Sequence, residues 1–284
     1  MAQGLTQSAE TIRKERQLWR ENFLRLSPHS DEDIWVIIAA SQYHHLKKTL
    51  PKKRLRTLEV GAGTAVLSGM LYHDNNSVCI LDYTIEALAI ARERLPHLMA
   101  VHADANALPF KDGSFDLVLS SGTLEHFRDM SKPIAEQIKV LGSGGVFYAN
   151  IIPRKFSVNS VFSLAYFAVA SAIMFFKGSF RRMTREELAF HLRYASNLFT
   201  SKDFPNNPYI HYEARLQPRK LAKTLSGMGL SHVRIRGATM FPVAPGIPYY
   251  TRLLRHFLPL FKIVDDTKLG LCCGMCVLVY GVKE

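Results

Sequence analysis

A glycine-rich turn between an apolar strand and a helix is the feature that most constrains the fold. Residues 57–68 read Thr-Leu-Glu-Val-Gly-Ala-Gly-Thr-Ala-Val-Leu-Ser, so a strand carrying Glu59 precedes the glycines Gly61 and Gly63. Glycine has no Cβ and tolerates positive φ, so backbone N–H groups in such a turn can approach a ligand closely. The acidic Glu59 would repel a pyrophosphate but not a zwitterionic or cationic ligand. The same glycine pair also occurs in turns that serve packing alone.

A second strand pattern ends in an acid at the spacing that α/β folds use for ligand binding. Residues 78–82, Val-Cys-Ile-Leu-Asp, have the composition of a buried strand that ends in Asp82. In doubly wound folds a ribose-binding acid lies roughly 20 residues beyond the glycine turn. We therefore expect the ends of these two strands to converge on one pocket.

Three further segments follow in an order that is specific, although each segment alone is weak. They are Asp-Ala-Asn-Ala-Leu-Pro-Phe at 104–110, Phe-Asp-Leu-Val at 115–118 and Leu-Glu-His at 124–126. Together with the glycine turn, this set resembles the class I S-adenosylmethionine (SAM) dependent methyltransferases, whose members carry D-A-x-x-L-P-F, F-D-x-V and L-E-H motifs. The resemblance covers about residues 55–150.

The resemblance implies SAM as the cofactor and a set of residues that bind it. Gly61 and Gly63 would face the methionine part of SAM, Asp82 the ribose hydroxyls, and Asp104 with Ala105 the adenine edge. Ser120 and Ser121 would border the methionine moiety. The complete expected set is Glu59, Gly61, Ala62, Gly63, Asp82, Tyr83, Asp104, Ala105, Ser120 and Ser121.

Two positions depart from the family pattern, and two other functions fit part of it. Ala65 stands where a third glycine is usual, and residues 142–145 read Gly-Ser-Gly-Gly in place of Pro-Gly-Gly. Ala65 is small enough for close strand-helix packing, so we expect only a modest effect on cofactor fit. The glycine turn with Asp82 would also suit a nicotinamide oxidoreductase, and all the motifs would suit a catalytically silent SAM-binding protein.

The alternation of strand and helix patterns predicts the fold class. Up to about residue 151 this alternation indicates an α/β, doubly wound, mostly parallel sheet with helices on both faces, and the resemblance implies the seven-stranded Rossmann-like methyltransferase fold. A helix over 218–229 and strands over 232–237 and 270–281 are expected to complete it. The closing strand would point Cys272 and Cys273 to opposite faces, so we expect structural thiols and no metal site, with thiol or arsenic chemistry as a minor alternative.

Helices are also expected before the domain and within two insertions. Amphipathic patterns predict helices over 10–26 and 31–50, whose residues Tyr43 and His44 would touch the cofactor from above. We expect the chain to divide into an N-terminal helical cap and one SAM-binding domain with two cap insertions after the fifth and sixth strands, at residues 1–50, 51–284, about 153–217 and about 242–268.

The first insertion contains 21 residues without a charge, 156–176, flanked by basic residues. Its length would suit a bilayer span, but a span there would put strands of one sheet on opposite sides of a membrane. The second insertion mixes aromatic residues with arginines. Either a lid packed on its own domain or a helix at the membrane interface fits these patterns, and the second would draw a hydrophobic or lipid-linked acceptor into the pocket. A fully soluble enzyme for a secondary metabolite is the alternative.

The chain is strongly basic, with a net charge of +12. The positive residues cluster at 47–56 and around the apolar segment, a combination that favours an anionic membrane surface over nucleic acid. The N-terminal residues lack the pattern of a secretory signal, and four cysteines suit a reducing compartment. We expect a cytoplasmic protein that is peripheral on the membrane.

Two histidine clusters are candidates for proton transfer from an acceptor hydroxyl. His126, with Glu125 before it, follows the fourth strand at the expected pocket mouth, and a histidine has a pKa suited to general base work. His211 is the second candidate base, oriented by Tyr212 or Glu213. Catalysis by positioning alone, with both histidines structural or solvated, is the alternative.

Overall fold

The computed structural model describes residues 32–127, 129–153, 217–238 and 267–284, with single residues outside these ranges. The predictions for helix 10–26 and for most of the two insertions therefore lie outside the described residues. Of the predicted first helix, Gln17 and Arg20 are described, and both are helical.

The described part of the chain forms the predicted seven-stranded α/β sheet. The strand order is β3-β2-β1-β4-β5-β7-β6, and β7 runs antiparallel to both of its neighbours while the other pairs are parallel. The strands are β1 (Arg56–Val60), β2 (Ser77–Asp82), β3 (Met99–His102), β4 (Phe115–Ser121), β5 (Leu141–Ile151), β6 (Leu230–Ala238) and β7 (Cys276–Lys283).

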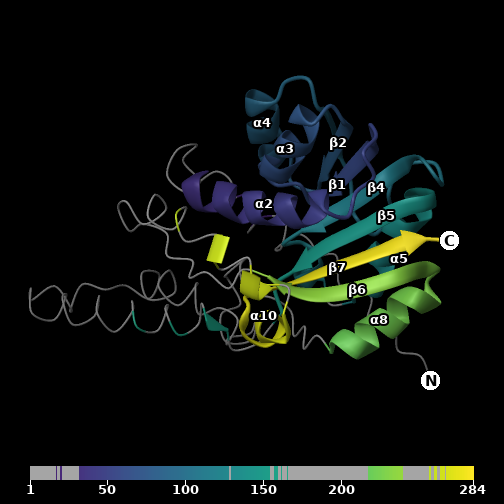
Figure 1. The fold of residues 1–284 in the computed structure, drawn as a ribbon. Coiled ribbons are helices and arrows are strands. Elements are labelled where there is room, and N and C mark those ends of the chain that lie inside the picture. Colours follow the sequence, from purple (N-terminus) through teal and green to yellow (C-terminus); the bar gives the residue numbers. More distant parts are fainter. Residues whose placement is uncertain are drawn as a thin grey trace, which may run out of the picture.

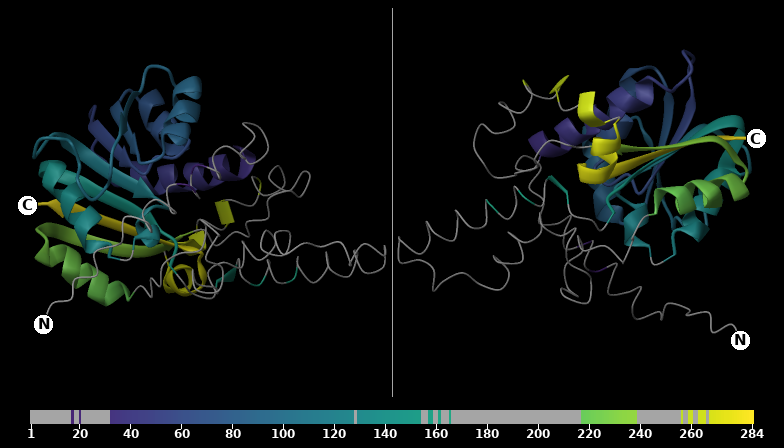
Figure 2. Two further views of the ribbon diagram at one scale, coloured as in Figure 1. Left: turned by 180° about the vertical axis from the view of Figure 1, so that it is seen from behind. Right: turned by 60° about the horizontal axis from the view of Figure 1, so that its bottom comes forward.

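Helices lie on both faces of this sheet (Figures 1 and 2). One face is covered by α2 (Glu32–Lys47), α3 (Val66–His73) and α4 (Ile85–Arg94), and α2 packs along α3. The other face carries α5 (Ser131–Val140) and α8 (Pro218–Gly227). The short elements η1 (Leu124–His126) and α10 (Lys268–Cys273) follow β4 and precede β7.

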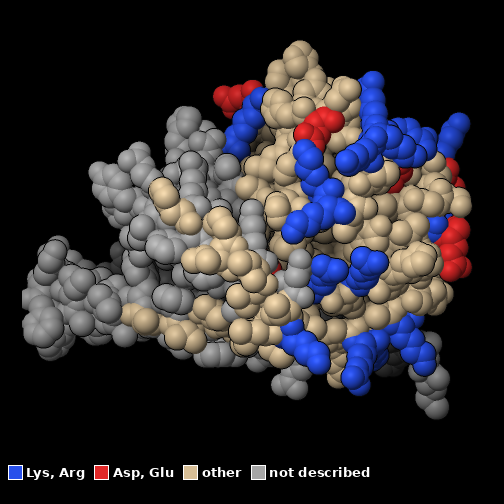
Figure 3. Space-filling view, in the orientation of Figure 1, with Lys and Arg blue, Asp and Glu red and all other residues tan. Residues whose placement is uncertain are grey.

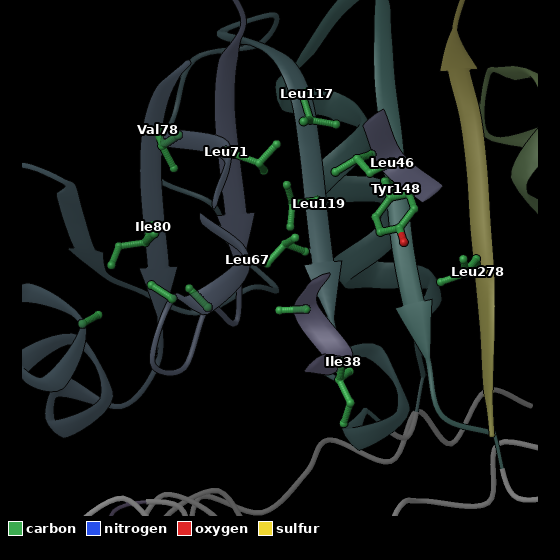
Figure 4. Packing of buried hydrophobic residues seen from close by; sticks show 14 of the residues in the cluster. Ile38, Leu46, Leu67, Leu71, Val78, Ile80, Leu117, Leu119, Tyr148 and Leu278 are labelled. Atoms are coloured by element: carbon green, nitrogen blue, oxygen red, sulfur yellow. The ribbon is translucent and has the colours of Figure 1, made fainter. Parts of the chain in front are cut away.

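The central strands are apolar on both sides because both sides are buried. On the α2 face, Leu67 and Leu71 of α3 and Leu46 of α2 pack against Leu117 and Leu119 of β4 (Figure 4). All five side chains are at most 3% exposed. Full burial of a leucine stabilises the folded state by roughly 1.5–3 kcal/mol, so this layer fixes where α2 and α3 lie on the sheet.

The parallel strands end at one edge of the sheet, here named the carboxyl edge, and begin at the opposite amino edge. The strand order reverses between β1 and β4, which makes the carboxyl ends of this pair the topological switch point where doubly wound folds bind ligands. At the same edge, the end of β5 at Ile151 pairs with Val277 and the end of β6 at Ala238 pairs with Cys276. The chain therefore enters both insertions from the carboxyl edge.

The predicted closing strand over 270–281 is wrong in its first part. Residues up to Cys273 belong to helix α10, where the Thr267 hydroxyl accepts a hydrogen bond from the Gly270 N–H at 3.2 Å and caps the first turn. A Cβ on Gly237 of β6 would overlap the backbone of Gly270 and Leu271, and a Cβ on Gly270 would overlap that of Val264 and Asp265. Backbone contact of this kind leaves no mark in hydrophobic periodicity, so alternation predicted a strand. Cys272 is exposed and Cys276 is buried in β7.

The basic stretch that joins α2 to β1 lies at the amino edge. Arg56 begins β1, and the residues before it, from Lys47 to Arg54, include five lysines and arginines, all of them exposed. Figure 3 shows lysine and arginine side chains spread over the part of the face where α2 ends, with few acids between them. The chain enters the first insertion from the opposite edge, after the end of β5. No helix among the described residues combines the length and apolar character needed to cross a bilayer.

The contact between α10 and β6 gives a stability prediction. We expect Gly237→Ala to lower the free energy of unfolding by about 1–3 kcal/mol or more, because the added Cβ would meet the backbone of Gly270 and Leu271, which no rotamer change can relieve. Gly227→Ala is the matched control. Its Cβ would meet nothing within 4 Å in α8, so it should be neutral or stabilise by up to about 1 kcal/mol. Urea unfolding of both variants measures the difference, and equal stabilities would contradict this packing.

Candidate cofactor and acceptor site

The glycine turn lies at the carboxyl end of β1, as the sequence predicts. Gly61 and Gly63 have φ values of 70° and 52°, in the left-handed region that favours glycine. The N–H groups of Gly61 and Ala62 donate to the Leu81 carbonyl at 2.8 and 3.0 Å, which ties the turn to β2. A Cβ at Gly61 would overlap the side chain of Thr123. At this position packing alone already requires glycine.

Asp82, at the end of β2, holds the turn from the side. Its carboxylate accepts hydrogen bonds from the N–H of Gly63 and the N–H of Thr84, both at 2.8 Å. The side chain is buried, and burial raises the pKa of Asp82 although these hydrogen bonds favour the ionised form. The resemblance implies that Asp82 binds the ribose hydroxyls, and in the structure the same carboxylate also fixes the glycine turn.

Glu59 is turned toward the start of α3. Its carboxylate accepts from the Ser68 N–H at 3.1 Å and the Ser68 hydroxyl at 2.5 Å, so it caps the first turn of the helix. Burial raises the pKa of Glu59 to about 7, and the charge of Asp82 adds to the rise. Between these residues Ala65 adopts left-handed backbone with a φ of 57°, which costs an alanine about 1–2 kcal/mol and explains why glycine is usual there.

Glu59 and Asp82 together make this part of the carboxyl edge negative. Each is acidic and buried, and no described lysine or arginine contributes to the pKa of either carboxyl group. Two acids in a buried setting raise each other's cost of ionisation, which a positive ligand would reduce. The residues present therefore fit a cationic or zwitterionic ligand and would oppose a pyrophosphate.

The end of β4 separates the two predicted serines. Ser121 is partly exposed on the α2 face and donates to the Gln42 side-chain oxygen at 2.7 Å. Ser120 points to the opposite face, is fully buried, and forms no hydrogen bond with the described residues. Only Ser121 can border a ligand on the α2 face.

Gln42 and Thr123 belong to the site, but sequence reasoning missed both. Gln42 comes from α2, and only the packing of that helix brings it to Ser121. Thr123 donates from its hydroxyl to the carbonyls of Gly61 at 3.2 Å and Ser121 at 3.3 Å, so it joins the ends of β1 and β4. The sequence offered one signal for Thr123, its position two residues before the predicted site residue Glu125.

The adenine side of the predicted site is built by the residues that follow β2 and β3. The His102 ring nitrogen Nε2 lies 2.9 Å from the Tyr83 carbonyl oxygen, which joins the two strand ends. Asp104 accepts from the N–H and the side-chain amide of Asn106 at 2.8 and 3.0 Å. Ala105 is buried under this turn. The structure thus brings the predicted residues from β1, β2, β3 and β4 to one edge.

Of the two groups of predicted proton-transfer residues, the structure describes only the first. His126 is half-buried in η1, and Glu125 beside it is fully buried. Burial raises the pKa of Glu125 to about 8. His211, Tyr212 and Glu213 lie outside the described residues. The Tyr43 hydroxyl is bonded to Asp74 and Lys47 beyond the end of α3, and its expected cofactor contact stays a prediction.

The strand order and the glycine turn at its switch point agree with the Rossmann-like methyltransferase fold that the resemblance implies. In agreement, residues 58–149 match the family described as methyltransferase domain, a stretch that runs from β1 into β5. A solved SAM-dependent methyltransferase of Mesorhizobium loti shares the fold, with a TM-score of 0.52 and 17% identity over 86% of this chain and 98% of that chain.

Two curated relatives each match about a third of the chain. A demethylmenaquinone methyltransferase of Renibacterium salmoninarum is 36% identical over 90 residues, 32% of this chain and 38% of the relative. The chloroplastic 2-methyl-6-phytyl-1,4-hydroquinone methyltransferase 1 of Oryza sativa subsp. japonica is 33% identical over 111 residues, 38% of this chain and 31% of the relative. The chain therefore matches less than half the length of either relative.

The buried carboxyl of Glu125 makes the stability of the protein depend on pH. Its pKa is about 8 in the folded state and about 4.3 in an unfolded chain, so folding favours the protonated form. The stabilisation is complete below the unfolded pKa and is lost as pH rises through the folded pKa. We expect the free energy of unfolding to fall more steeply with pH in the wild type than in Glu125→Gln, by about 1.4 kcal/mol per pH unit within that window.

Urea unfolding at pH values from 5 to 8 measures these slopes. Glu93→Gln, which removes an exposed glutamate from α4, is the control and should follow the wild type. If the curves of wild type and Glu125→Gln stay parallel across the window, the carboxyl does not titrate as its burial requires.

Proposed function

We propose that this protein is a SAM-dependent methyltransferase that transfers the methyl group to a hydrophobic, quinone-like acceptor at carbon or oxygen. The observation that carries the proposal is the pair of buried carboxylates, Glu59 and Asp82, on either side of the glycine turn. A sulfonium cofactor is positive and relieves their mutual repulsion. NAD would bring its pyrophosphate against the same negative edge.

When bound, SAM supplies a methyl group already activated by the positive sulfur. The protein has to hold the acceptor in line with that methyl group and to remove a proton where the acceptor loses one. Asp82 and Glu59 keep the glycine turn in place, and Ser121 faces the pocket from β4. His126, half-buried in η1, is the described group we assign to proton removal, and His211 keeps that role as a second candidate.

The assignment of a quinone-like acceptor is supported by the two curated relatives and by the insertions. Both relatives are named for quinone or hydroquinone methylation. Both insertions leave from the carboxyl edge, and the first contains the uncharged segment 156–176. An apolar cap over the pocket would exclude water and receive an apolar substrate. The family match ends at residue 149, so both insertions lie outside the matched part of the chain.

The same insertions support a peripheral membrane location on the cytoplasmic side. Basic residues at 181, 182 and 185 follow the apolar segment, a combination that suits an anionic bilayer surface. The basic stretch 47–56 begins β1 at the opposite edge, so it would face away from a membrane that contacts the insertions. We therefore expect the basic residues that follow the apolar segment to contribute to lipid binding and the basic stretch 47–56 to contribute little.

Calorimetry with SAM tests the proposed function directly. We expect SAM and its demethylated product to bind and NAD not to bind. Asp82→Asn should weaken SAM binding at least 10-fold, because the charge that faces the ligand and holds Gly63 is lost. Asp112→Asn removes an exposed acid before β4 and should leave affinity unchanged. Absence of SAM binding by the wild type would overturn the proposal, and methyl transfer to a demethylated quinone would complete it.

Vesicle co-sedimentation tests the membrane orientation. Each basic residue near an anionic surface contributes about 1 kcal/mol, so reversing three charges at Arg181, Arg182 and Arg185 to Glu should lower binding to anionic vesicles about 100-fold or more. The matched control reverses Lys52, Lys53 and Arg54 at the amino edge and should change binding little. If the control loses as much binding as the first variant, the insertions do not face the membrane.

A further inference from the structure

Glu125 differs from the other two buried carboxyl groups of the carboxyl edge. Its side chain is 0% exposed, and neither carboxylate oxygen accepts a hydrogen bond of normal geometry from the described residues. The backbone N–H groups of Glu125 and Ile152 favour its ionised form, but burial outweighs them. Glu59 is bonded to Ser68 and Asp82 to Gly63 and Thr84, so of these three only Glu125 has no hydrogen bond of normal geometry to the described residues.

The fold places Glu125 beside the glycine turn. Three residues, Gly122, Thr123 and Leu124, separate Glu125 from the end of β4. The Thr123 hydroxyl donates to the carbonyl of Gly61 in the glycine turn. The Glu125 Oε1 atom lies 3.7 Å from the place where a Cβ on Gly122 would be. Gly122 in turn donates to the Asn150 carbonyl of β5 at 2.9 Å. The carboxyl group therefore sits at the switch point, between the glycine turn and the start of the first insertion.

Burial favours the neutral form of a carboxyl group, and a positive charge nearby favours the anion. A cation within about 4–6 Å lowers the pKa of a carboxyl by about 1–3. The titratable side chains on the adjoining elements are His126 in η1, Glu59 on β1, Asp82 on β2 and Tyr148 on β5. None of them contributes to the pKa of Glu125 among the described residues, so a ligand charge would be the dominant influence.

We propose that Glu125 keeps its proton while the pocket is empty and releases it to solvent when the positively charged cofactor binds. This inference rests on the proposed function. It makes a carboxylate available in the residues that follow β4 only when the cofactor is bound. Proton balance closes over the cycle: the acceptor gains a methyl group, the electron pair of the broken carbon–sulfur bond stays on sulfur, and the acceptor's proton, removed by His126, replaces the proton that Glu125 released. The neutral thioether that remains no longer opposes a protonated Glu125.

Calorimetry in two buffers of different ionisation enthalpy, phosphate and Tris, counts the protons released on binding. At pH 7 we expect the wild type to release about half to one proton more with SAM than Glu125→Gln does. The demethylated product, whose sulfur is neutral, should release much less from the wild type. Glu93→Gln, an exposed acid on α4, should release as much as the wild type. Any proton released by Glu59 is common to all these proteins and cancels in the comparison.

Infrared difference spectra of the wild type give a second readout that needs no variant. The band of a protonated, buried carboxyl should disappear on addition of SAM and stay on addition of the demethylated product. If SAM binds with equal proton release in wild type and Glu125→Gln, or the carboxyl band does not change, the inference is overturned and the proposed function stands. Absence of SAM binding would overturn the proposed function itself.

Discussion

The attachment of the glycine turn to two buried carboxylates is the interaction on which the rest of the site depends. Asp82 accepts from the Gly63 N–H and Glu59 from Ser68, so one acid holds the turn and the other holds the helix that follows it. Both groups are buried, where a hydrogen bond to a charge is stronger and its loss is more costly than in water. The binding edge and the β1-α3 junction are therefore one structural unit, and the acids that shape the pocket also stabilise the fold.

The distribution of charge separates the two edges of the sheet. Glu59, Asp82 and Glu125 lie at the carboxyl edge, whereas the exposed basic stretch from Lys47 leads into β1 at the amino edge. Two of its cations are neutralised locally, because Lys47 pairs with Asp74 and Arg56 with Asp116, both at 2.9 Å. A positive cofactor would thus be attracted to one edge, while the opposite edge presents positive charge to solvent. The apolar insertions join the domain at the acidic edge, so acceptor and cofactor would approach from the same side.

Most of the fold could be predicted from the sequence because the central strands are short apolar runs bounded by turns. The run that ends at Asp82 and the alternation up to residue 151 gave strands and helices that the structure confirms. The prediction failed over the residues that form α10, since a backbone contact between Gly237 and Gly270 selects a helix there. It also treated Ser120 and Ser121 alike, although neighbouring strand residues face opposite sides of the sheet.

What the sequence by itself determined is the order of motifs: the glycine turn, the acids that end two strands, and the set of residues expected at the carboxyl edge. These depend on local chemistry and on spacing along the chain. Only the tertiary structure decided that Gln42 of α2 meets Ser121, that Glu125 is fully buried, and that residues 47–56 lie at the edge opposite the ends of β5 and β6. Such facts depend on which elements pack together across the sheet. For residues far apart in the chain, the spacing along the sequence does not indicate whether they are in contact.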